Sequence, residues 1–438
     1  MIRKAFYIAF FFLVSLSAFA QQIDKAKLDA YFDALEKNDK FMGSVAISQN
    51  GNVIYTRTLG FSNVETRKKP DQNTRYRIGS ISKTFTAVLV FKAIEEKKLS
   101  LTETLDKYFP GIKNASKITI AQLLAHRSGI HNFTDNADYV KWNTQKKTEA
   151  EMVEIVTKGG SDFEPDSKAV YSNSNYLLLT YILEKVNKKP FGALLTEKIF
   201  KPAGLTNTAL GGKINPANES YSYEYAGKWV KQPETDMSVP AGAGALVSTP
   251  TDLTKFADAL FGGKLVTPQS LDKMKTLRDN FGMGLFQIPF YEKKSFGHTG
   301  GIDGFRSLLG YFPDDKIAYS YITNGAVVVP NNVAIAMLSA VYGKPVDIPE
   351  FKTYTPDPAD LDKYVGVYAS NQIPIKITVS RAGNVLSAQG SGQPAFTLEA
   401  TDKDKFKFEA GSLSMEFIPA EKKMLLRQGG GVFDFRKE

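Results

Sequence analysis

The stretch "YRIGSISKTF", residues 76–85, places Ser80 three residues before Lys83 at the start of a long apolar run. The run to residue 99 has apolar residues all along, at Ile81, Phe85, Val88, Leu89 and Ile94, which predicts a helix buried on most sides. Residues three apart share one helix face. A serine hydroxyl becomes a nucleophile when a neighbour takes its proton, and burial lowers the pKa of a lysine toward the range of a base. The same spacing recurs at Ser270 and Lys273, so the rest of the chain must distinguish the two pairs.

Elements on both sides of this helix predict one antiparallel sheet. Residues 41–62 alternate polar and apolar positions around Asn50-Gly51, the strongest short hairpin signal. Residues 305–325 predict two strands joined at Asp314-Asp315. Between them, helices are indicated by apolar periodicity or by capping residues at 119–129, 175–187 and 249–263, and a last apolar helix follows at 331–343. Strands, a helical middle, strands and a final helix predict an α+β fold whose sheet is built from both ends of this region.

The C-terminal part has a different pattern. Residues 343–361 contain four prolines and no helical period, which predicts a linker. From residue 363 onward, short strand-like runs alternate with Gly, Asn, Asp and Lys, as expected of a small antiparallel barrel or sandwich. We therefore divide the chain into a leader (1–20), a main domain (21–345), a linker (346–358) and a small β domain (359–438).

The N-terminus predicts export. A basic head with Arg3 and Lys4 precedes an apolar stretch that ends in Ala18-x-Ala20, the order of a signal peptide cleaved near Ala20-Gln21. The alternative is a membrane anchor, but the run is short for a span. The 438-residue chain has no cysteine, which excludes disulfides and thiolate chemistry. The net charge of +9 is scattered, with no basic run interleaved with aromatics, so nucleic acid is not an expected partner. A periplasmic or secreted protein without a lasting membrane anchor is predicted.

Two further patterns each occur once, Tyr171-x-Asn173 and His298-Thr299-Gly300. Ser-x-x-Lys, Tyr-x-Asn and His-Thr-Gly in this order resemble the signature of the penicillin-recognising serine hydrolases. These include class C β-lactamases, serine D,D-carboxypeptidases, D-aminopeptidases and related esterases. "LLAHRSGI", residues 123–130, is similar to the family's Leu-Leu-x-His-Thr-Ser-Gly stretch, with Arg127 in place of threonine. The resemblance covers about residues 25–345 and implies the β-lactamase/D,D-peptidase fold.

The resemblance also implies catalytic roles. Ser80 would be the acylated nucleophile. Lys83 and Tyr171 would share the work of the base, and Tyr171 would relay a proton to the leaving group. The backbone N–H groups of Ser80 and Gly301 would form the oxyanion hole.

Substrate binding is implied for the remaining motif residues. Asn173 would bind an amide of the acyl side chain, and His298, Thr299 and Gly300 would line the strand along which the substrate lies. Glycine fits a strand position that another backbone or a ligand approaches closely. The His-Thr-Gly variant, together with the extra β domain, is more typical of D,D-carboxypeptidases, D-aminopeptidases and esterase-like members than of class C β-lactamases.

Each residue also has a purely structural interpretation. Ser80 could cap a helix and Lys83 could be solvated. Tyr171 could be a core aromatic, Asn173 a helix cap and His298 a structural histidine. The order of the three motifs favours catalysis, whereas His126 and His131 are expected to be structural.

We expect an exported serine hydrolase that cleaves amide bonds of D-amino-acid peptides of the D-Ala-D-Ala type through an acyl-serine intermediate. A β-lactamase or a promiscuous esterase is the alternative within this class, with cell-wall peptides or β-lactams as candidate substrates. A penicillin-binding sensor with little turnover, or a binding module without activity, belongs to other classes. No cofactor is expected, and no spacing of histidines and carboxylates indicates a metal site.

Overall fold

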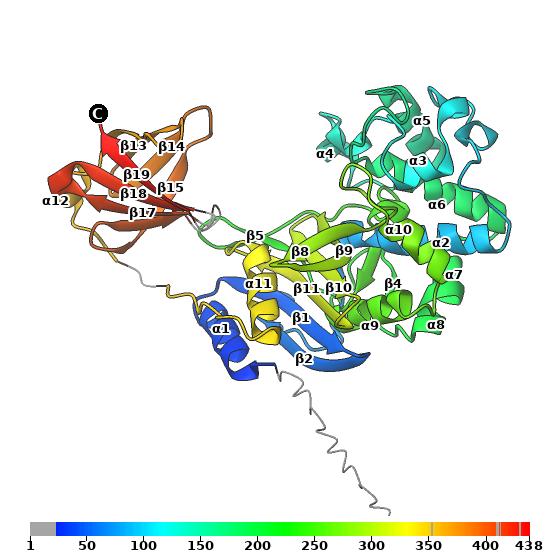
Figure 1. Cartoon of the computed structure of the whole chain (residues 1–438), viewed down its shortest axis with the longest axis horizontal. Coiled ribbons are helices and arrows are strands. Elements are labelled where there is room, and N and C mark those ends of the chain that lie inside the picture. Colours follow the sequence, from blue (N-terminus) through cyan, green and yellow to red (C-terminus); the bar gives the residue numbers. More distant parts are fainter. Residues whose placement is uncertain (1–22, 352–353, 409–410, 412, 429–430) are drawn as a thin grey trace, which may run out of the picture.

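The main sheet confirms the predicted α+β architecture. The computed structural model describes residues 23–438 apart from 352–353, 409–410, 412 and 429–430 (Figure 1). Six antiparallel strands lie in the order β2-β1-β11-β10-β9-β8, so β1 of the N-terminal hairpin pairs with β11 from the far end of this region. The strands are β1 (Phe41–Gln49), β2 (Asn52–Leu59), β8 (Phe286–Phe290), β9 (Lys293–Ile302), β10 (Phe305–Phe312) and β11 (Ile317–Ala326).

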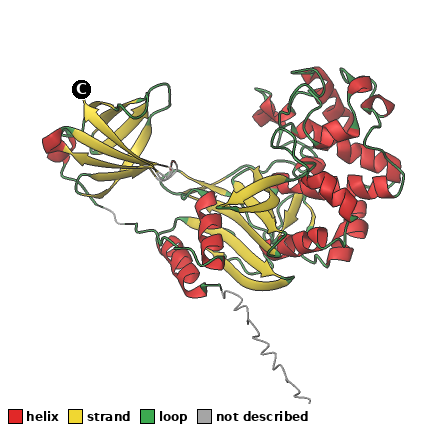
Figure 2. Ribbon diagram, viewed as in Figure 1, coloured by secondary structure: helices red, strands yellow, loops and turns green. Residues whose placement is uncertain are grey.

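Helices cover both faces of this sheet (Figures 1 and 2). On one face pack α1 (Lys25–Lys37) and α11 (Pro330–Val341), and on the other α2 (Ser82–Glu95) and α9 (Pro250–Phe261). Successive strand residues point to opposite faces. Accordingly, Leu308 belongs to the core beneath α1 and α11, and Leu309 to the core beneath α2 and α9.

The middle of the chain forms a mostly helical region beside the sheet (Figure 2). Its core is continuous with that of α2, which is buried on nearly all sides as predicted. The other helices are α3 (Ile120–Leu124), α4 (Tyr139–Trp142), α5 (Glu149–Gly159), α6 (Asn173–Asn187), α7 (Phe191–Leu195), α8 (Lys201–Ala203) and α10 (Pro268–Lys275). Two small sheets complete the main domain: β3 (Tyr76–Arg77), β7 (Leu246–Ser248) and β4 (Ala209–Leu210), and β5 (Tyr223–Tyr225) with β6 (Trp229–Lys231).

Local sequence signals account for several of these boundaries. Asn50 and Gly51 both have positive φ, as the tight turn between β1 and β2 requires. Thr119 forms a capping box with Gln122 at the start of α3. Thr249 caps α9, whose first residue is Pro250. The predicted hairpin and these helix starts are therefore confirmed.

The predicted helix over residues 80–99 differs at both ends. Ser80 lies in a 3₁₀ turn, Gly79–Ile81 (η1), and α2 begins at Ser82. Gly79 has φ +50°, which no regular helix allows. At the other end α2 stops at Glu95, and Lys97 is left-handed with φ +57°.

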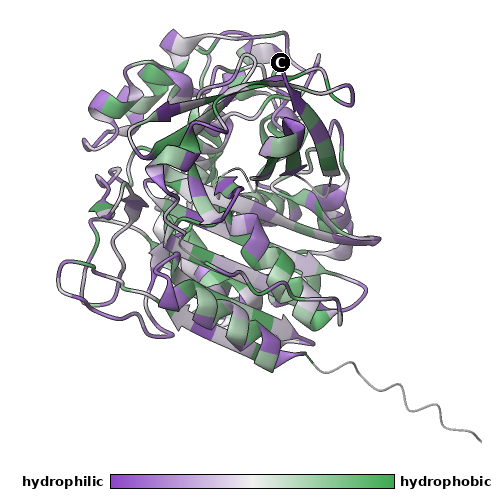
Figure 3. Cartoon of the chain, turned by 90° about the vertical axis from the view of Figure 1, so that its left-hand side faces the viewer, coloured by the Kyte–Doolittle hydropathy of each residue, from purple (hydrophilic) through white to green (hydrophobic). Residues whose placement is uncertain are grey.

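The C-terminal strands close into a barrel. Of the two architectures predicted for this part of the chain, the barrel is therefore confirmed and the sandwich is not. Buried and less buried residues alternate along its strands, as in β17, because one side of each strand faces the small interior. Figure 3 shows hydrophobic and hydrophilic positions interspersed along the strands of both parts of the chain. After the short helix α12 (Pro358–Leu361) the barrel strands are β12 (Gly366–Ala369), β13 (Lys376–Ala382), β14 (Val385–Gly390), β15 (Phe396–Asp402), β16 (Lys405–Phe408), β17 (Leu413–Ile418), β18 (Lys423–Gln428) and β19 (Gly431–Lys437).

The predicted leader, residues 1–20, lies outside the described residues. Within the described part of the chain, no helix combines the length and apolarity needed to cross a bilayer. The proposed domain boundaries stay predictions.

Candidate active site

Ser80 stands where the small sheet of β3 leads into α2. The backbone around it is pressed against β9: a Cβ on Gly79 would lie 2.8 Å from the nitrogen of Gly301, and a Cβ on Gly300 only 2.1 Å from the carbonyl oxygen of Ile78. Real Cβ atoms do not approach that closely, so both positions require glycine. The structure thus brings the backbones of Ser80 and Gly301 together, where they were predicted to form an oxyanion hole.

Lys83 lies directly beside Ser80 and is fully buried. Its Nζ is 3.0 Å from Ser80 Oγ, and it donates to Asn173 Oδ1 and to the carbonyl oxygen of Ala243, both at 2.7 Å. Burial lowers the pKa of Lys83 well below its usual value. A neutral amine has two N–H groups and one lone pair. In the neutral form, with the two N–H groups on Asn173 and Ala243, the lone pair would face Ser80 Oγ and could accept its proton.

Tyr171 lies against the same pair. The ammonium position of Lys83 is 4.8 Å from the centroid of its ring. Burial raises the pKa of Tyr171, and a hydrogen bond with Ser80 only partly opposes this. The side chain is therefore a neutral phenol at physiological pH, able to donate its proton and receive another.

Asn173 is the first residue of α6. Its Oδ1 accepts from Lys83, and its Nδ2 donates to Asn132 Oδ1 at 3.2 Å and Thr134 Oγ1 at 3.1 Å. In this structure Asn173 therefore orients Lys83. The expected contact with a substrate amide stays a prediction.

His298, Thr299 and Gly300 lie within β9, next to Tyr171. The ring of His298 is buried, 6.3 Å from the ring of Tyr171 and 4.6 Å from that of Phe286. Its Nδ1 donates to the carbonyl oxygen of Thr299 at 2.5 Å, because a carbonyl can only accept. Desolvation lowers the pKa of His298 to about 3. His298 therefore contributes a neutral aromatic ring to this side of the site and no positive charge.

The competing serines have other partners. Ser270 donates to Glu95 at 2.7 Å, and Lys273 is exposed. Ser82, the second serine of the opening stretch, is buried and accepts from the backbone N–H of Leu246 at 3.1 Å. Among Ser80, Ser82 and Ser270, only Ser80 has a buried lysine within hydrogen-bond distance.

His126, expected from the sequence to be structural, packs against Tyr171 and bonds the backbone on both sides of it. Its Nδ1 accepts from the N–H of Ser172 at 3.1 Å, and its carbonyl accepts from the N–H of Val170 at 2.9 Å. Its ring lies 4.5 Å from the ring of Tyr171. The position of His126 within "LLAHRSGI" was the one sequence feature that could have indicated this role. No local pattern shows that this segment contacts residues 170–172.

A cavity of about 340 Å³ opens over Ser80. Phe281 and Phe286 line it and were not singled out in the sequence, because isolated aromatics in a loop and an edge strand carry no pattern. The full lining is Ser80, Tyr171, Phe281, Phe286, His298, Thr299, Gly300 and Gly301.

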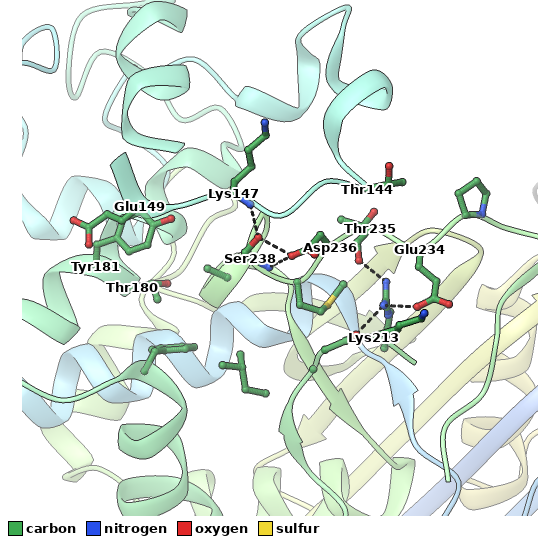
Figure 4. Close-up of a pocket in the computed structure, with 18 of the residues that line it drawn as sticks. Thr144, Lys147, Glu149, Thr180, Tyr181, Lys213, Glu234, Thr235, Asp236 and Ser238 are labelled. Carbon is green, nitrogen blue, oxygen red and sulfur yellow. Dashed lines mark hydrogen bonds and ion pairs between the residues drawn. The ribbon is translucent and has the colours of Figure 1, made fainter. Parts of the chain in front are cut away.

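A larger cavity of about 980 Å³ lies elsewhere and includes neither Ser80 nor Tyr171 (Figure 4). Figure 4 shows Glu234, Thr235 and Asp236 on one wall and Thr180 with Tyr181 on another. The smaller cavity, which is lined by Ser80 and Tyr171, is therefore the candidate active site.

Buried Arg77 lines the larger cavity and supports the smaller one. It donates to Asp303 Oδ2 and to the carbonyl oxygen of Thr235, both at 2.8 Å. Asp303 is in the turn that follows Gly301, and Arg77 precedes Ser80 by three residues. This ion pair joins the two segments that meet at Ser80.

Comparison with known proteins agrees with this geometry. The family model described as Beta-lactamase matches residues 28–343. Penicillin-binding protein 4* of Bacillus subtilis (strain 168) is 25% identical over 434 residues, spanning 92% of this chain and 95% of that protein. Teichoic acid D-alanine hydrolase of Staphylococcus aureus is 28% identical over 286 residues, spanning 63% of this chain and 69% of that protein. The solved structure of a D-stereospecific amidohydrolase from Streptomyces sp. superposes with a TM-score of 0.63 at 26% identity, covering 72% of this chain and 99% of that one.

Proposed function

Because this chain belongs to the β-lactamase family of serine hydrolases, we propose that Ser80 is the residue acylated when it cleaves D-amino-acid amides or esters. Membership confirms the resemblance inferred from the three motifs, and with it a serine hydrolase that acts on amide bonds. The assignment of roles rests on one observation above all: buried Lys83 has its Nζ 3.0 Å from Ser80 Oγ, with two other oxygens occupying its N–H groups.

In the proposed acylation step, Ser80 Oγ attacks the carbonyl carbon while its proton passes to Lys83 Nζ. The carbonyl oxygen becomes an oxyanion held by the backbone N–H groups of Ser80 and Gly301. When the intermediate collapses, the bond from carbon to the leaving nitrogen or oxygen breaks. The phenol of Tyr171 gives its proton to the leaving group and recovers one from Lys83.

Deacylation reverses these roles. Water attacks the ester carbon of acyl-Ser80 and loses a proton to the Lys83–Tyr171 pair, and Ser80 Oγ leaves with a proton. Free enzyme and a carboxylic acid result, so the cycle needs only water as co-reactant.

A D-configured acyl donor is proposed from the names of the relatives. One is a teichoic acid D-alanine hydrolase, and a similar solved structure is a D-stereospecific amidohydrolase. Both names specify D stereochemistry, which supports the D-amino-acid substrates expected from the sequence. Export is likewise proposed, on the basic head and apolar stretch of residues 1–20.

A fluorophosphonate probe tests the nucleophile. Ser80→Ala should abolish covalent labelling and hydrolysis of D-alanyl p-nitroanilide. Ser270→Ala, in the other Ser-x-x-Lys pattern, should leave both intact. Labelling that survives Ser80→Ala would sink the assignment.

Slow reaction with penicillins is a second candidate activity, favoured by the similarity over 92% of the chain to a protein named penicillin-binding protein 4*. A labelled penicillin should then acylate Ser80 with a lifetime of minutes to hours. Release within seconds would instead indicate a β-lactamase.

A further inference from the structure

The cavity over Ser80 carries no charged side chain. Its eight lining residues include no Asp, Glu, Lys or Arg. Phe281 and Phe286 pack against each other with ring centroids 5.3 Å apart, and Phe286 continues onto His298 at 4.6 Å. The wall beside Tyr171 is thus aromatic from three different segments of the chain.

His298 does not supply a cation to this wall. Its Nδ1 proton is committed to the carbonyl oxygen of Thr299, and the ring is 2% exposed among aromatic neighbours. Protonating Nε2 would bury a charge without a counter-ion, at a large cost in free energy.

Arg127 and Arg278, which contact or belong to the segment 278–281 that carries Phe281, are already paired. Arg127, which replaces the threonine expected there, is 4% exposed and binds Asp166 through Nε at 2.6 Å and also binds Asp279. Arg278 binds the same Asp166 at 2.7 Å. The two arginines are therefore neutralised by the two aspartates. The same ion pairs fix the segment 278–281, which carries Phe281.

Arg306 is a cation on β10, the strand that pairs with the motif strand. It is the cross-strand partner of Gly301, but Ser307 beside it bonds to Ile78 at 2.8 Å on the face of α2. Adjacent strand residues point to opposite faces, so Arg306 lies on the face of the sheet opposite to Ser307 and Ile78. Its Nη1 donates to the carbonyl oxygens of Asp303 and Phe305.

We propose that this enzyme prefers substrates whose leaving group is uncharged, the alcohol of an ester or the amine of a neutral amide, and reacts more slowly with leaving groups that end in a carboxylate. The inference rests on the proposed function, in which Tyr171 protonates the leaving group and so places it in the cavity that Tyr171 lines. A carboxylate in this cavity would be desolvated without gaining a cationic partner. This raises the free energy of both the bound substrate and the transition state. The bond that breaks is the acyl C–N or C–O bond, and the departing atom takes the proton relayed through Tyr171.

A matched substrate pair tests the proposal. N-acetyl-D-alanyl-D-alaninamide and N-acetyl-D-alanyl-D-alanine differ only in the carboxamide or carboxylate of the leaving group. We expect kcat/KM of the full-length enzyme to be at least about tenfold higher for the carboxamide. Equal rates, or a preference for the carboxylate, would overturn the proposal.

Charge-adding variants test the cavity itself. Phe286→Arg should shift the rate ratio toward the carboxylate by about tenfold, since it supplies the missing counter-ion. Phe281→Arg, on a different segment, is the second variant in case the first does not fold. Tyr291→Arg adds the same charge at a position that is 65% exposed and outside the cavity, and should leave the ratio unchanged. A ratio that stays constant in folded Phe286→Arg and Phe281→Arg enzymes would also overturn the proposal.

Labelling separates this inference from the proposed function. If wild-type enzyme is not labelled at Ser80 by the fluorophosphonate, the proposed function fails. If Ser80 is labelled and the carboxylate substrate is preferred, only the leaving-group inference fails.

Discussion

The imidazole of His126 lies under the phenol ring of Tyr171, with ring centroids 4.5 Å apart, and holds the backbone on both sides of that tyrosine. Its Nδ1 accepts from Ser172, so this nitrogen must be unprotonated, and desolvation lowers the pKa of His126 well below its usual value. The proton shuttle proposed for Tyr171 therefore depends on a neutral histidine that does not itself touch the substrate.

Replacing this histidine by an aromatic ring without hydrogen-bonding atoms tests its positioning role. His126→Phe keeps an aromatic ring beside Tyr171 but leaves the N–H of Ser172 without its acceptor. We expect the acylation rate to fall about 10- to 100-fold with little change in KM, because a small displacement of Tyr171 affects the transition state most. Single-turnover kinetics would measure it. His131→Phe, at a partly exposed histidine paired with Asp162, is the control and should leave acylation near wild type.

The pH dependence of acylation should reflect Lys83. Because burial lowers its pKa, the neutral amine is available at a lower pH than in an ordinary lysine, and activity should fall as acid protonates it. Tyr171, whose pKa is raised, stays protonated through about pH 10, so no loss is expected on the alkaline side below that value. Lys83→Arg should lower kcat by about 10³-fold or more, since a guanidinium cannot act as a base. A pH–rate profile centred on the ordinary pKa of lysine would contradict this interpretation.

Gly300 should tolerate no side chain. Gly300→Ala places a methyl group 2.1 Å from the carbonyl oxygen of Ile78, which must push β9 away from Ser80. We expect kcat/KM to drop about 100-fold or more through loss of the oxyanion geometry. Gly111→Ala, where nothing lies within 4 Å of the added carbon, is the matched control. Near-normal activity in Gly300→Ala would show that β9 is not fixed against the nucleophile.

Two buried neutral histidines should make the fold sensitive to acid. The pKa of His298 is lowered to about 3, whereas an unfolded histidine has a pKa of about 6.5. The unfolded chain therefore binds more protons below that pH, and stability is complete above pH 6.5 and lost as the pH falls toward 3. His298 alone should account for roughly 2–3 kcal/mol at pH 4.5. Denaturant unfolding of wild type and His298→Phe from pH 4.5 to 7.5 measures it, and parallel curves would refute the assignment.

The elements that could be predicted from the sequence are those with a strong local signal. The hairpin around Asn50-Gly51, the buried helix after Ser80 and the capping box at Thr119 each follow from spacing within a dozen residues. The start of α2 could not be predicted, because it depends on Gly79 meeting Gly301 across the chain.

By itself, the sequence determined which residue types are available for catalysis and in what order they occur, since Ser80, Lys83, Tyr171 and the His298 motif can be identified from short patterns. Only the tertiary structure decided how these groups are used. It directs Asn173 onto Lys83, hydrogen-bonds His298 to the carbonyl of Thr299, pairs Arg127 with Asp166 and Asp279, and places Phe281 and Phe286 beside Ser80. The physical reason is that charge state and hydrogen-bond partner depend on burial and on contacts between segments far apart in the chain, which no local pattern encodes.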